Sequence, residues 1–272
     1  MSKKERIDVL LVDKGLIETR EKAKRAVMAG LVYVESERID KPGMKVSIDA
    51  PLTVKGDVLP YVSRGGLKLE KAIKVFDLKL EGAVVLDIGA STGGFTDCAL
   101  QNGAKKVYAL DVGYNQLAWK LRTDERVCVM ERTNFRYVKA EDLIHGLPNF
   151  ATIDVSFISL KLILPVLKTL LLENSHVIAL IKPQFEAGRE EVGKKGIVRE
   201  PKTHLKVVQD ITDFSRNEGY EIAGIDYSPI KGGEGNIEFL LHLRWNSKED
   251  IVPPLFSVEE VVSQAHEQLK KD

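Results

Sequence analysis

The chain has 272 residues, of which 44% are hydrophobic and 29% are charged. This composition is typical of a globular protein and leaves room for one large or two smaller domains. The net charge of +0 argues neither for nor against a nucleic-acid partner, but the charges are unevenly placed. Residues 1–79 hold 17 basic and 12 acidic side chains, whereas the remaining residues hold 23 and 28. The basic front of the chain therefore suggests contact with a polyanion.

Several kinds of protein are disfavoured by what the sequence lacks. The two cysteines, Cys98 and Cys128, have no Cys-x-x-Cys spacing, and the five histidines show no ligand spacing. We therefore expect a reducing compartment and no metal site. No apolar segment follows the first residues, and the longest apolar region, residues 150–172, is interrupted by three charged side chains. These features predict a cytoplasmic protein with neither an export signal nor a membrane span.

The first 58 residues have the pattern of a small α+β module. An apolar helical face runs from Ile7 to Val12 and stops near Gly15. A second helix, over residues 20–29, turns its cations outward and ends at a glycine, as helices commonly do. Short strands are expected at residues 31–34, 45–48 and 52–54, with a turn through residues 35–38.

This order of elements resembles the S4 RNA-binding domain. The resemblance is carried by Arg6-Ile7-Asp8, Gly15, Thr19-Arg20, Lys24-Arg25, residues 29–32 and Lys41-Pro42. In that family the basic helix lies against structured RNA and contacts phosphate and shape more than base edges. The resemblance implies phosphate contacts by Arg20, Lys24 and Arg25, with Arg6, Lys14 and Lys22 as further candidates. The alternative is a cationic helix face that is simply solvated.

Residues 59–63 are expected to link this module to a second domain, residues 64–246. The linker is short and is not rich in Gly and Ser, so the two domains should be coupled rather than freely tethered. A helix is expected over residues 64–76, with Lys68 among its cations and Arg64 at its start as a further candidate RNA contact. Residues 247–272 form a tail with a polar helix near residues 257–270, which we expect to be peripheral.

The most informative stretch of the second domain is residues 84–97. An apolar strand ends in an aspartate, a glycine-rich turn follows over residues 89–94, and a helical pattern begins directly after it. The spacing is neither the G-x-G-x-x-G of a dinucleotide site nor the G-x-x-x-x-G-K-[ST] of a triphosphate site. It suits a ligand without pyrophosphate, such as S-adenosylmethionine, whose ammonium and sulfonium a carboxylate can face. The expected wall of that pocket is formed by Asp87, Gly89, Ala90, Ser91, Gly93, Gly94 and Phe95.

Strands and helices alternate through the rest of this domain. The further strands are expected at residues 106–111, 127–130, 150–154, 177–182, 221–227 and 237–243, with helices at 160–172 and 202–217. Together with the strand at 84–88 they predict a doubly wound α/β fold, a mostly parallel seven-stranded sheet with helices on both faces.

Ligands bind outside the carboxyl ends of the strands in such a sheet, where Asp111, Asp154 and Lys182 also lie. Asp111 follows the glycine turn by about twenty residues, the usual distance for a carboxylate on ribose hydroxyls. Val112 and Asn134 are further candidates for contact with the cofactor.

Two other methylation chemistries fit these residues poorly. Methyltransferases that act on exocyclic amines commonly carry (Asp/Asn)-Pro-Pro-(Tyr/Phe) after the fourth strand, where this chain has Asp154-Val-Ser-Phe157. Methylation at pyrimidine C5 needs a nucleophilic cysteine near the target. Cys98 follows the cofactor turn and Cys128 lies inside a strand, so neither is well placed.

Residues 62–244 resemble an FtsJ-type ribose 2′-O-methyltransferase. The Lys-Asp-Lys-Glu signature of that family matches Lys68, Asp154, Lys182 and Glu238, each within its own motif. An S4 domain joined to this catalytic domain is the arrangement of the TlyA (haemolysin A) family of rRNA cytidine 2′-O-methyltransferases. One departure is the linker, which reads Leu-Pro-Tyr-Val over residues 59–62 instead of Arg-x-Trp-Val.

This resemblance implies a cofactor, a partner and a reaction. The implied cofactor is S-adenosylmethionine, with Asp154 also contacting it, and the partner is ribosomal RNA in ribosomal subunits; no membrane is implied and a monomer is favoured. A ribose hydroxyl is a poor nucleophile at neutral pH and needs orientation and a base. A lysine whose pKa is lowered by burial and by a neighbouring cation can be that base. We expect Lys182 to be the base and Lys68 to hold the 2′-oxygen, while the two carboxylates orient the amines.

Two other functions stay open. An RNA-binding or ribosome-assembly factor could keep this fold without turnover, and it predicts subunit binding that survives Lys182→Ala. A lytic protein, which the older family name suggests, is opposed by the lack of an export signal, a membrane span or a long amphipathic helix with a basic face.

Overall fold

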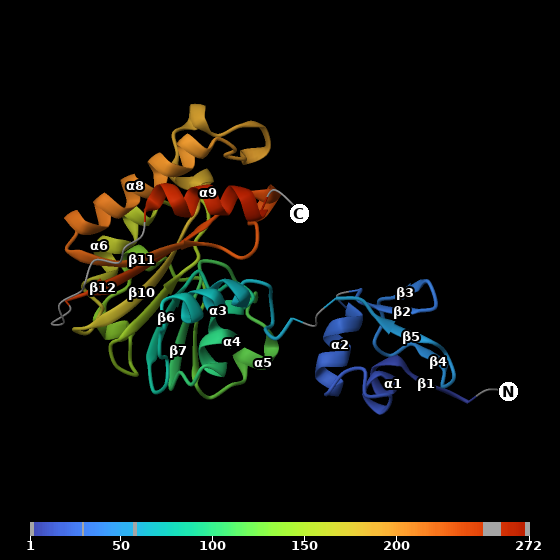
Figure 1. The fold of residues 1–272 in the computed structure, drawn as a ribbon. Helices are drawn as coiled ribbons and strands as arrows, with labels where there is room; N and C mark the ends of the chain where they lie inside the picture. The colour runs from blue at the N-terminus through green and yellow to red at the C-terminus, as the bar shows by residue number, and fades with distance from the viewer. Residues whose placement is uncertain (1–2, 29, 57–58, 247–256, 270–272) are drawn as a thin grey trace. The chain divides into compact units, whose positions relative to one another are not determined.

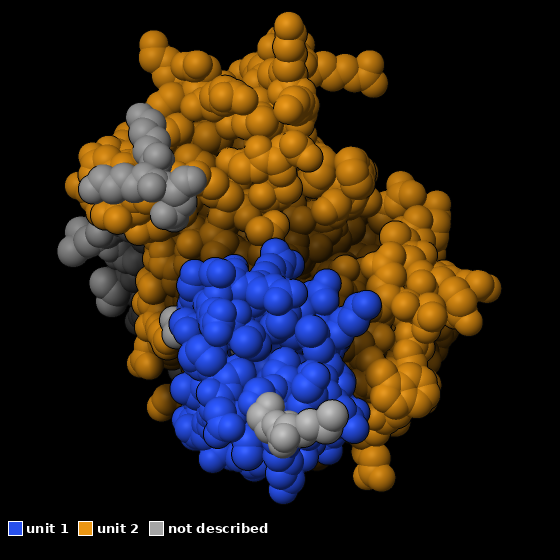
Figure 2. Space-filling model, turned by 90° about the vertical axis from the view of Figure 1, so that its right-hand side faces the viewer, with its two compact units in different colours: residues 1–60 blue, residues 61–272 orange. Residues whose placement is uncertain are grey.

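The structure is a computed structural model that describes residues 3–28, 30–56, 59–246 and 257–269. The chain divides into two compact units, the N-terminal unit of residues 1–60 and the C-terminal unit of residues 61–272 (Figures 1 and 2). Each unit has its own hydrophobic core, so each is described by itself.

The N-terminal unit packs two helices with two small antiparallel sheets. Its helices are α1 (Ile7–Asp13) and α2 (Arg20–Met28). One sheet pairs β1 (Lys4–Arg6) with β4 (Lys45–Ser47), and the other places β2 (Val32–Val34) between β3 (Glu37–Ile39) and β5 (Leu52–Val54). The two helices bury one apolar face each, because their apolar residues recur every three or four positions. The fully buried side chains of these faces are Ile7, Leu11, Ala23, Ala26 and Val27.

Strand β3 differs from the turn expected at residues 35–38. Glu37 and Arg38 are exposed, and two charged residues in succession are not a pattern that predicts a strand. Ile39 is buried in the core. An edge strand tolerates charged side chains on its open side, and its pairing with β2 makes it visible only in three dimensions.

The C-terminal unit is built on a seven-stranded sheet in the order β11-β12-β10-β9-β6-β7-β8. The strands are β6 (Val84–Ile88), β7 (Lys106–Leu110), β8 (Val127–Met130), β9 (Phe150–Ile153), β10 (Ser175–Ile181), β11 (Tyr220–Tyr227) and β12 (Phe239–Trp245). β12 runs antiparallel to both of its neighbours, β10 and β11, whereas the pairs from β8 to β10 are all parallel. The strand order reverses between β6 and β9, and ligands bind at the carboxyl ends of strands at such a reversal.

Helices cover both faces of this sheet (Figure 1). The first core lies under α3 (Gly66–Val75), α4 (Gly94–Gln101) and α5 (Trp119–Arg122). The second core lies under α6 (Leu164–Leu167), α8 (Pro201–Asn217) and α9 (Val258–Leu269). Successive residues of β6 alternate between them, with Val85 in the first core and Leu86 in the second. The doubly wound seven-stranded fold is therefore confirmed.

Three details differ from the sequence-based expectations. The helix expected over residues 160–172 is a 3₁₀ turn (Leu160–Leu162) and the four-residue α6, which has a proline in its first turn. In the linker, Tyr61 is buried and the amide of Val62 donates to Asp97, so both belong to the C-terminal unit. Within the tail, α9 is not peripheral, because its apolar face joins the second core. The boundary at residue 58 and residues 247–256 lie outside the described residues.

Candidate active site

The turn after β6 brings two distant strand ends into contact. Gly89 has a φ of +88°, and a Cβ atom there would lie 2.4 Å from the carbonyl oxygen of Asp154. The amide of Asp154 donates to the carbonyl of Ile88 at 3.0 Å. Only glycine satisfies both the positive φ and this close approach. Gly89 therefore holds Asp154 against the end of β6.

Asp87 lies beneath this turn and does not reach the surface. It is fully buried and accepts hydrogen bonds from the hydroxyls of Thr96 at 2.6 Å and Thr152 at 2.8 Å. Burial raises the pKa of Asp87 to about 6, although both threonines favour the carboxylate. In this structure the carboxylate of Asp87 joins β6 to α4 and β9, and its contact with the cofactor stays a prediction.

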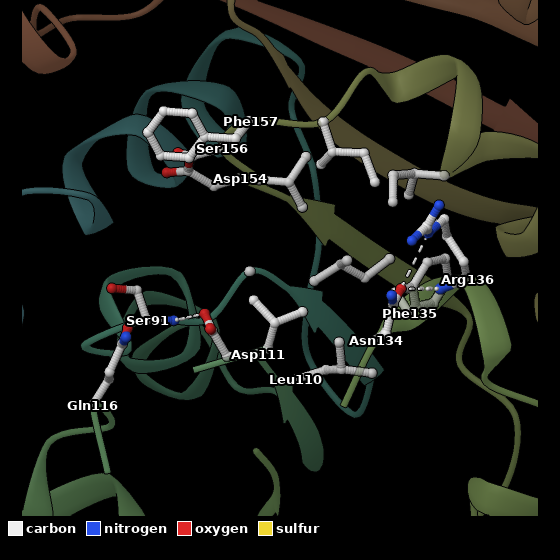
Figure 3. A pocket seen from close by; sticks show the side chains of 16 residues that line it. Ser91, Leu110, Asp111, Gln116, Asn134, Phe135, Arg136, Asp154, Ser156 and Phe157 are labelled. Carbon is white, nitrogen blue, oxygen red and sulfur yellow. Dashed lines mark hydrogen bonds between the residues drawn. The ribbon is translucent and has the colours of Figure 1, made fainter. Parts of the chain in front are cut away.

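A cavity of about 460 Å³ lies at the carboxyl ends of β6, β7 and β9 (Figure 3). Its apolar wall includes Ile88, Leu110, Phe135 and Ile163. Pockets of this size with apolar walls and a few polar groups are typical small-molecule sites. Its polar side chains include Ser91, Asp111, Gln116, Asn134, Asp154 and Ser156.

Asp111 is held in this cavity by two backbone amides. Its Oδ2 accepts from the amide of Ser91 at 2.8 Å (Figure 3). Its Oδ1 accepts from the amide of Gly113 at 2.7 Å. Each carboxylate oxygen has a further lone pair with which it can accept a ligand hydroxyl. The oxygen of Asn134 caps the next turn by accepting from the amide of Arg136 at 3.1 Å. Val112 lines the same cavity and is 71% exposed.

The other residues of the glycine turn divide between two sides. Ala90, Ser91, Gly94 and Phe95 line a second cavity, described below. Gly93 faces away, since a Cβ atom there would lie 2.2 Å from the side chain of Leu121. Gly93 thus packs against α5, and its expected contact with the cofactor stays a prediction.

The four signature residues lie together, and one of them, Asp154, also lines the first cavity. Asp154 accepts from both lysines, with its Oδ1 2.5 Å from Nζ of Lys182 and its Oδ2 3.3 Å from Nζ of Lys68. Glu238 approaches Lys68 from the other side at 2.8 Å. Lys182 also donates to the hydroxyl of Ser156 at 3.1 Å. Charges alternate along this chain of contacts, so no like-charged pair is in direct contact.

The charge of Lys68 is stabilised within the tetrad. Burial by itself would lower the pKa of Lys68, but the charges of Asp154 and Glu238 outweigh burial and raise it. Burial likewise opposes the charge of Asp154, yet the two lysines lower its pKa. Lys68 is therefore held as a cation. Lysine and aspartate are rarely buried unless paired, and here every member has a partner.

A second cavity of about 250 Å³ contains all four tetrad residues. It shares Gly89, Ser91, Asp154 and Ser156 with the first cavity, so the two meet at the end of β9. A ligand bound in the first cavity can thus present a group to the tetrad.

Several site residues escaped the sequence analysis. Ser156 and Phe157 follow Asp154 after Val155. Gly232 lies so close to Glu238 that a Cβ atom there would be 2.0 Å from Oε1. The position of Ser156 and Phe157 two and three residues after a strand-end acid was a usable signal. Gly232 precedes Glu238 by six residues without a recognisable pattern, so no signal pointed to it.

The candidate RNA-binding cations of the N-terminal unit mostly have partners within it. Arg6 and Arg20 both donate to buried Asp8, at 2.9 and 3.0 Å. The hydrogen bond from Arg6, together with Arg20, lowers the pKa of Asp8 to about 2 against the effect of burial. Arg6 and Arg20 therefore have a structural role as well as any RNA contact.

The remaining candidate RNA-binding cations of that unit make more exposed contacts. Lys22 pairs with Glu18, Lys24 pairs with Glu21 at 2.8 Å, and Lys14 donates to the carbonyl of Ala50 at 3.0 Å. Such exposed contacts contribute little to stability and can be exchanged for phosphate. Arg25 keeps a buried Nη1 without a hydrogen-bond partner, and Arg64, in the C-terminal unit, is exposed.

Two further findings concern other kinds of site. Across the described ranges, no helix is long and apolar enough to cross a membrane. The same residues contain no group of three or more histidine, cysteine or acidic side chains placed to hold a metal ion.

A sheet of this order, with a ligand cavity above the turn that follows β6, is the fold of Rossmann-like S-adenosylmethionine-dependent methyltransferases. The family model described as FtsJ-like methyltransferase matches residues 61–245, and the S4 domain model matches residues 5–50. The chain therefore belongs to the TlyA family, in which an S4 domain precedes an FtsJ-like methyltransferase domain.

Several known proteins match this chain over nearly its whole length. YqxC of Bacillus subtilis is 64% identical over 272 residues, which cover 99% of this chain and 97% of the relative. The 16S/23S rRNA (cytidine-2′-O)-methyltransferase TlyA of Mycobacterium tuberculosis is 40% identical over 245 residues, covering 90% and 91%. A solved structure from Streptococcus thermophilus is 58% identical, covers 100% of this chain and 98% of that one, and has a TM-score of 0.77.

Proposed function

We propose that this protein transfers a methyl group from S-adenosylmethionine to a ribose 2′-hydroxyl of ribosomal RNA, with cytidine as the target nucleoside. The observation that carries this proposal is the tetrad, in which Asp154 bridges Lys182 and Lys68 beside a ligand cavity. The rRNA substrate is supported by the named activity of the Mycobacterium tuberculosis relative and by the S4 domain.

The residues of the first cavity fit S-adenosylmethionine. Its apolar walls, formed in part by Leu110 and Phe135, suit an adenine ring, and Asp111 has lone pairs free for ribose hydroxyls. Asp154 and Ser91 stand where the two cavities meet and can face the amino acid part of the molecule. When bound, this cofactor supplies an electrophilic methyl group on a sulfonium.

The tetrad residues orient the target hydroxyl and remove its proton. Lys68, which is held as a cation by Asp154 and Glu238, donates to the 2′-oxygen and stabilises the charge that develops there. The ammonium of Lys182, which pairs with Asp154 in this structure, must first release a proton. Its amine then accepts the proton of the hydroxyl as the oxygen forms its new bond. Ser156 fixes the direction of Lys182. A positioned base of this kind contributes about 10²–10⁴-fold, and alignment of the reacting atoms supplies much of the rest.

The test is transfer of labelled methyl from S-adenosylmethionine to isolated 30S and 50S subunits, followed by mapping of 2′-O-methyl positions in their rRNA. The intact protein should label at least one subunit, and Lys182→Ala should reduce labelling at least about 100-fold. Lys105→Ala is the matched control, since Lys105 is an exposed lysine just before the amino end of β7 and should be dispensable.

The same experiment separates catalysis from RNA binding alone. Subunit affinity of Lys182→Ala, measured by filter binding, should stay within about threefold of the intact protein. If the intact protein binds subunits but labels none of them, the assembly-factor interpretation replaces the enzymatic one. If labelling occurs on a base rather than on a ribose oxygen, the proposed role of the tetrad is wrong.

A further inference from the structure

A third cavity adjoins the tetrad. It has a volume of about 420 Å³ and lies under the connection between β11 and β12, beside the end of α9 at Leu269. Arg64 and Gly232 line both this cavity and the tetrad cavity, so the two are neighbours within the C-terminal unit. We call the third cavity the side cavity.

The charged side chains of the side cavity are not paired within the described residues. Arg64 and Lys231 line it, and neither side chain has a hydrogen bond or an ion pair to another described group. The lysines of the tetrad contrast with them, because each has a carboxylate partner. Glu234 also lines the cavity, which leaves a net charge of +1 for the three groups. Unpaired cations beside a substrate cavity suit an anion that arrives with the substrate.

The remaining wall of the side cavity is apolar. Pro229, Ile230 and Leu269 contribute it, at the point where the chain leaves β11 and where α9 ends. Apolar side chains beside cations form the kind of surface on which a nucleotide lies, with its base on the apolar part and its phosphate on the cations.

The connectivity of the substrate decides what occupies this cavity. A ribose whose 2′-hydroxyl lies in the tetrad cavity belongs to a polymer, so its two phosphodiester links must leave that cavity. The side cavity adjoins that cavity and offers two cations, Arg64 and Lys231, that are unpaired within the described residues. We propose that the side cavity binds the RNA nucleotide next to the methylated one. Its phosphate lies between Arg64 and Lys231, and its base rests on Pro229, Ile230 and Leu269. This inference rests on the proposed function.

Salt-dependent binding tests the phosphate contact. Lys231→Gln should weaken subunit binding and raise KM, while kcat at saturating subunit stays within about twofold, because Lys231 lines only the side cavity. The slope of log affinity against log salt should fall by about 1, so the loss of affinity between 50 and 200 mM salt shrinks about fourfold. Glu234→Gln removes a negative charge and should leave binding equal or tighter. Lys105→Gln is the control and should change neither the slope nor KM.

Photo-crosslinking tests which nucleotide is bound. Once the methylated nucleotide is mapped, rRNA with 4-thiouridine at its 5′ or its 3′ neighbour is assembled and irradiated with the intact protein. One of the two neighbours should crosslink to residues 229–235 or to Leu269, and Ile230→Ser should reduce the yield.

The two proposals fail in different ways. Methyl transfer to the same RNA without a crosslink to this segment from either neighbour overturns the side-cavity assignment and leaves the enzymatic function intact. An equal salt slope for Lys231→Gln and Lys105→Gln also overturns the phosphate contact. If the intact protein transfers no methyl to any subunit, the proposed function fails instead.

Discussion

The ammonium of Lys182 lies 2.5 Å from one oxygen of Asp154, at the ends of two neighbouring parallel strands. The other oxygen of the same carboxylate binds Lys68 from α3 at 3.3 Å. One carboxylate therefore sets the spacing of the two cations between which the target oxygen is proposed to bind.

Replacing this shared counter-ion should damage both stability and activity. Asp154→Asn leaves two buried ammonium groups with less compensation, which costs about 3–5 kcal/mol when a buried pair is broken. We expect a loss of that order in the free energy of unfolding, measured in urea, and at least about 100-fold less methyl transfer. Asp226→Asn is the control, because Asp226 pairs with Lys71 at 3.0 Å and is 16% exposed against 19% for Asp154. It should lose stability while keeping most of its activity per folded molecule.

Comparing alanine variants of two glycines distinguishes the cost of backbone strain from the cost of a direct clash at the site. Gly82 has a φ of +71° with nothing near its missing Cβ, so Gly82→Ala should cost only the strain, about 1–2 kcal/mol. Gly89→Ala adds a collision with the carbonyl of Asp154 and should cost more. It should also lower cofactor affinity and kcat, measured by calorimetry and by methyl transfer. Equal stability and activity of the two variants would contradict the close approach between the turn and Asp154.

Glu186 joins the segments that carry Lys182 and Asp154. It lies in α7 (Pro183–Glu186), and it accepts from the hydroxyl of Ser159 at 2.6 Å and from the amide of Leu160 at 2.8 Å. Glu186→Ala breaks both bonds and should lower kcat about 10-fold or more, since small misplacements of reacting groups are costly. Glu186→Gln can still accept from the amide and donate to Ser159, so it should restore most of kcat. If the two variants have the same kcat, Glu186 does not position the tetrad.

A buried histidine pair should make the C-terminal unit sensitive to acid. Nδ1 of His204 in α8 lies 2.8 Å from Nε2 of His266 in α9. Burial, together with the charge of His266, lowers the pKa of His204 from 6.5 to about 4. Because the folded pKa is the lower one, this stabilisation is complete above pH 6.5 and is lost as the pH falls towards 4, in total about 3 kcal/mol.

Unfolding curves between pH 4 and 8 check this expectation. His204→Leu should remove part of the decrease below pH 6.5, whereas His145→Gln, at an exposed position, should not. Asp87 acts with the opposite sign, since its raised pKa of about 6 means that protonation there favours the folded state at low pH. The difference between intact protein and each variant is therefore the quantity to compare. A curve for His204→Leu that parallels the intact protein would argue against the pair.

Local pattern was enough to find the strand-end residues of the site. Asp111, Asp154 and Lys182 end apolar runs, and parallel strands place their carboxyl ends along one edge. The glycine turn was equally visible, because turn chemistry is local. Local pattern did not predict the interrupted helix at residues 160–167 or the charged edge strand β3. Their formation depends on pairing and packing with distant parts of the chain.

The sequence by itself determined most of the order of elements and the two kinds of domain, since these depend on residues close together in the chain. The four members of the tetrad came from the resemblance of short motifs to the FtsJ-type enzymes. Only the tertiary structure decided how those members are used. Burial in three dimensions placed Asp87 under the turn and tied it to Thr152. Folding also brought Lys68 and Glu238 to 2.8 Å across 170 residues, and opened a side cavity next to them. The burial of Asp87, the contact between Lys68 and Glu238 and the side cavity all depend on which side chains are packed together away from water. That is a property of tertiary packing rather than of local sequence.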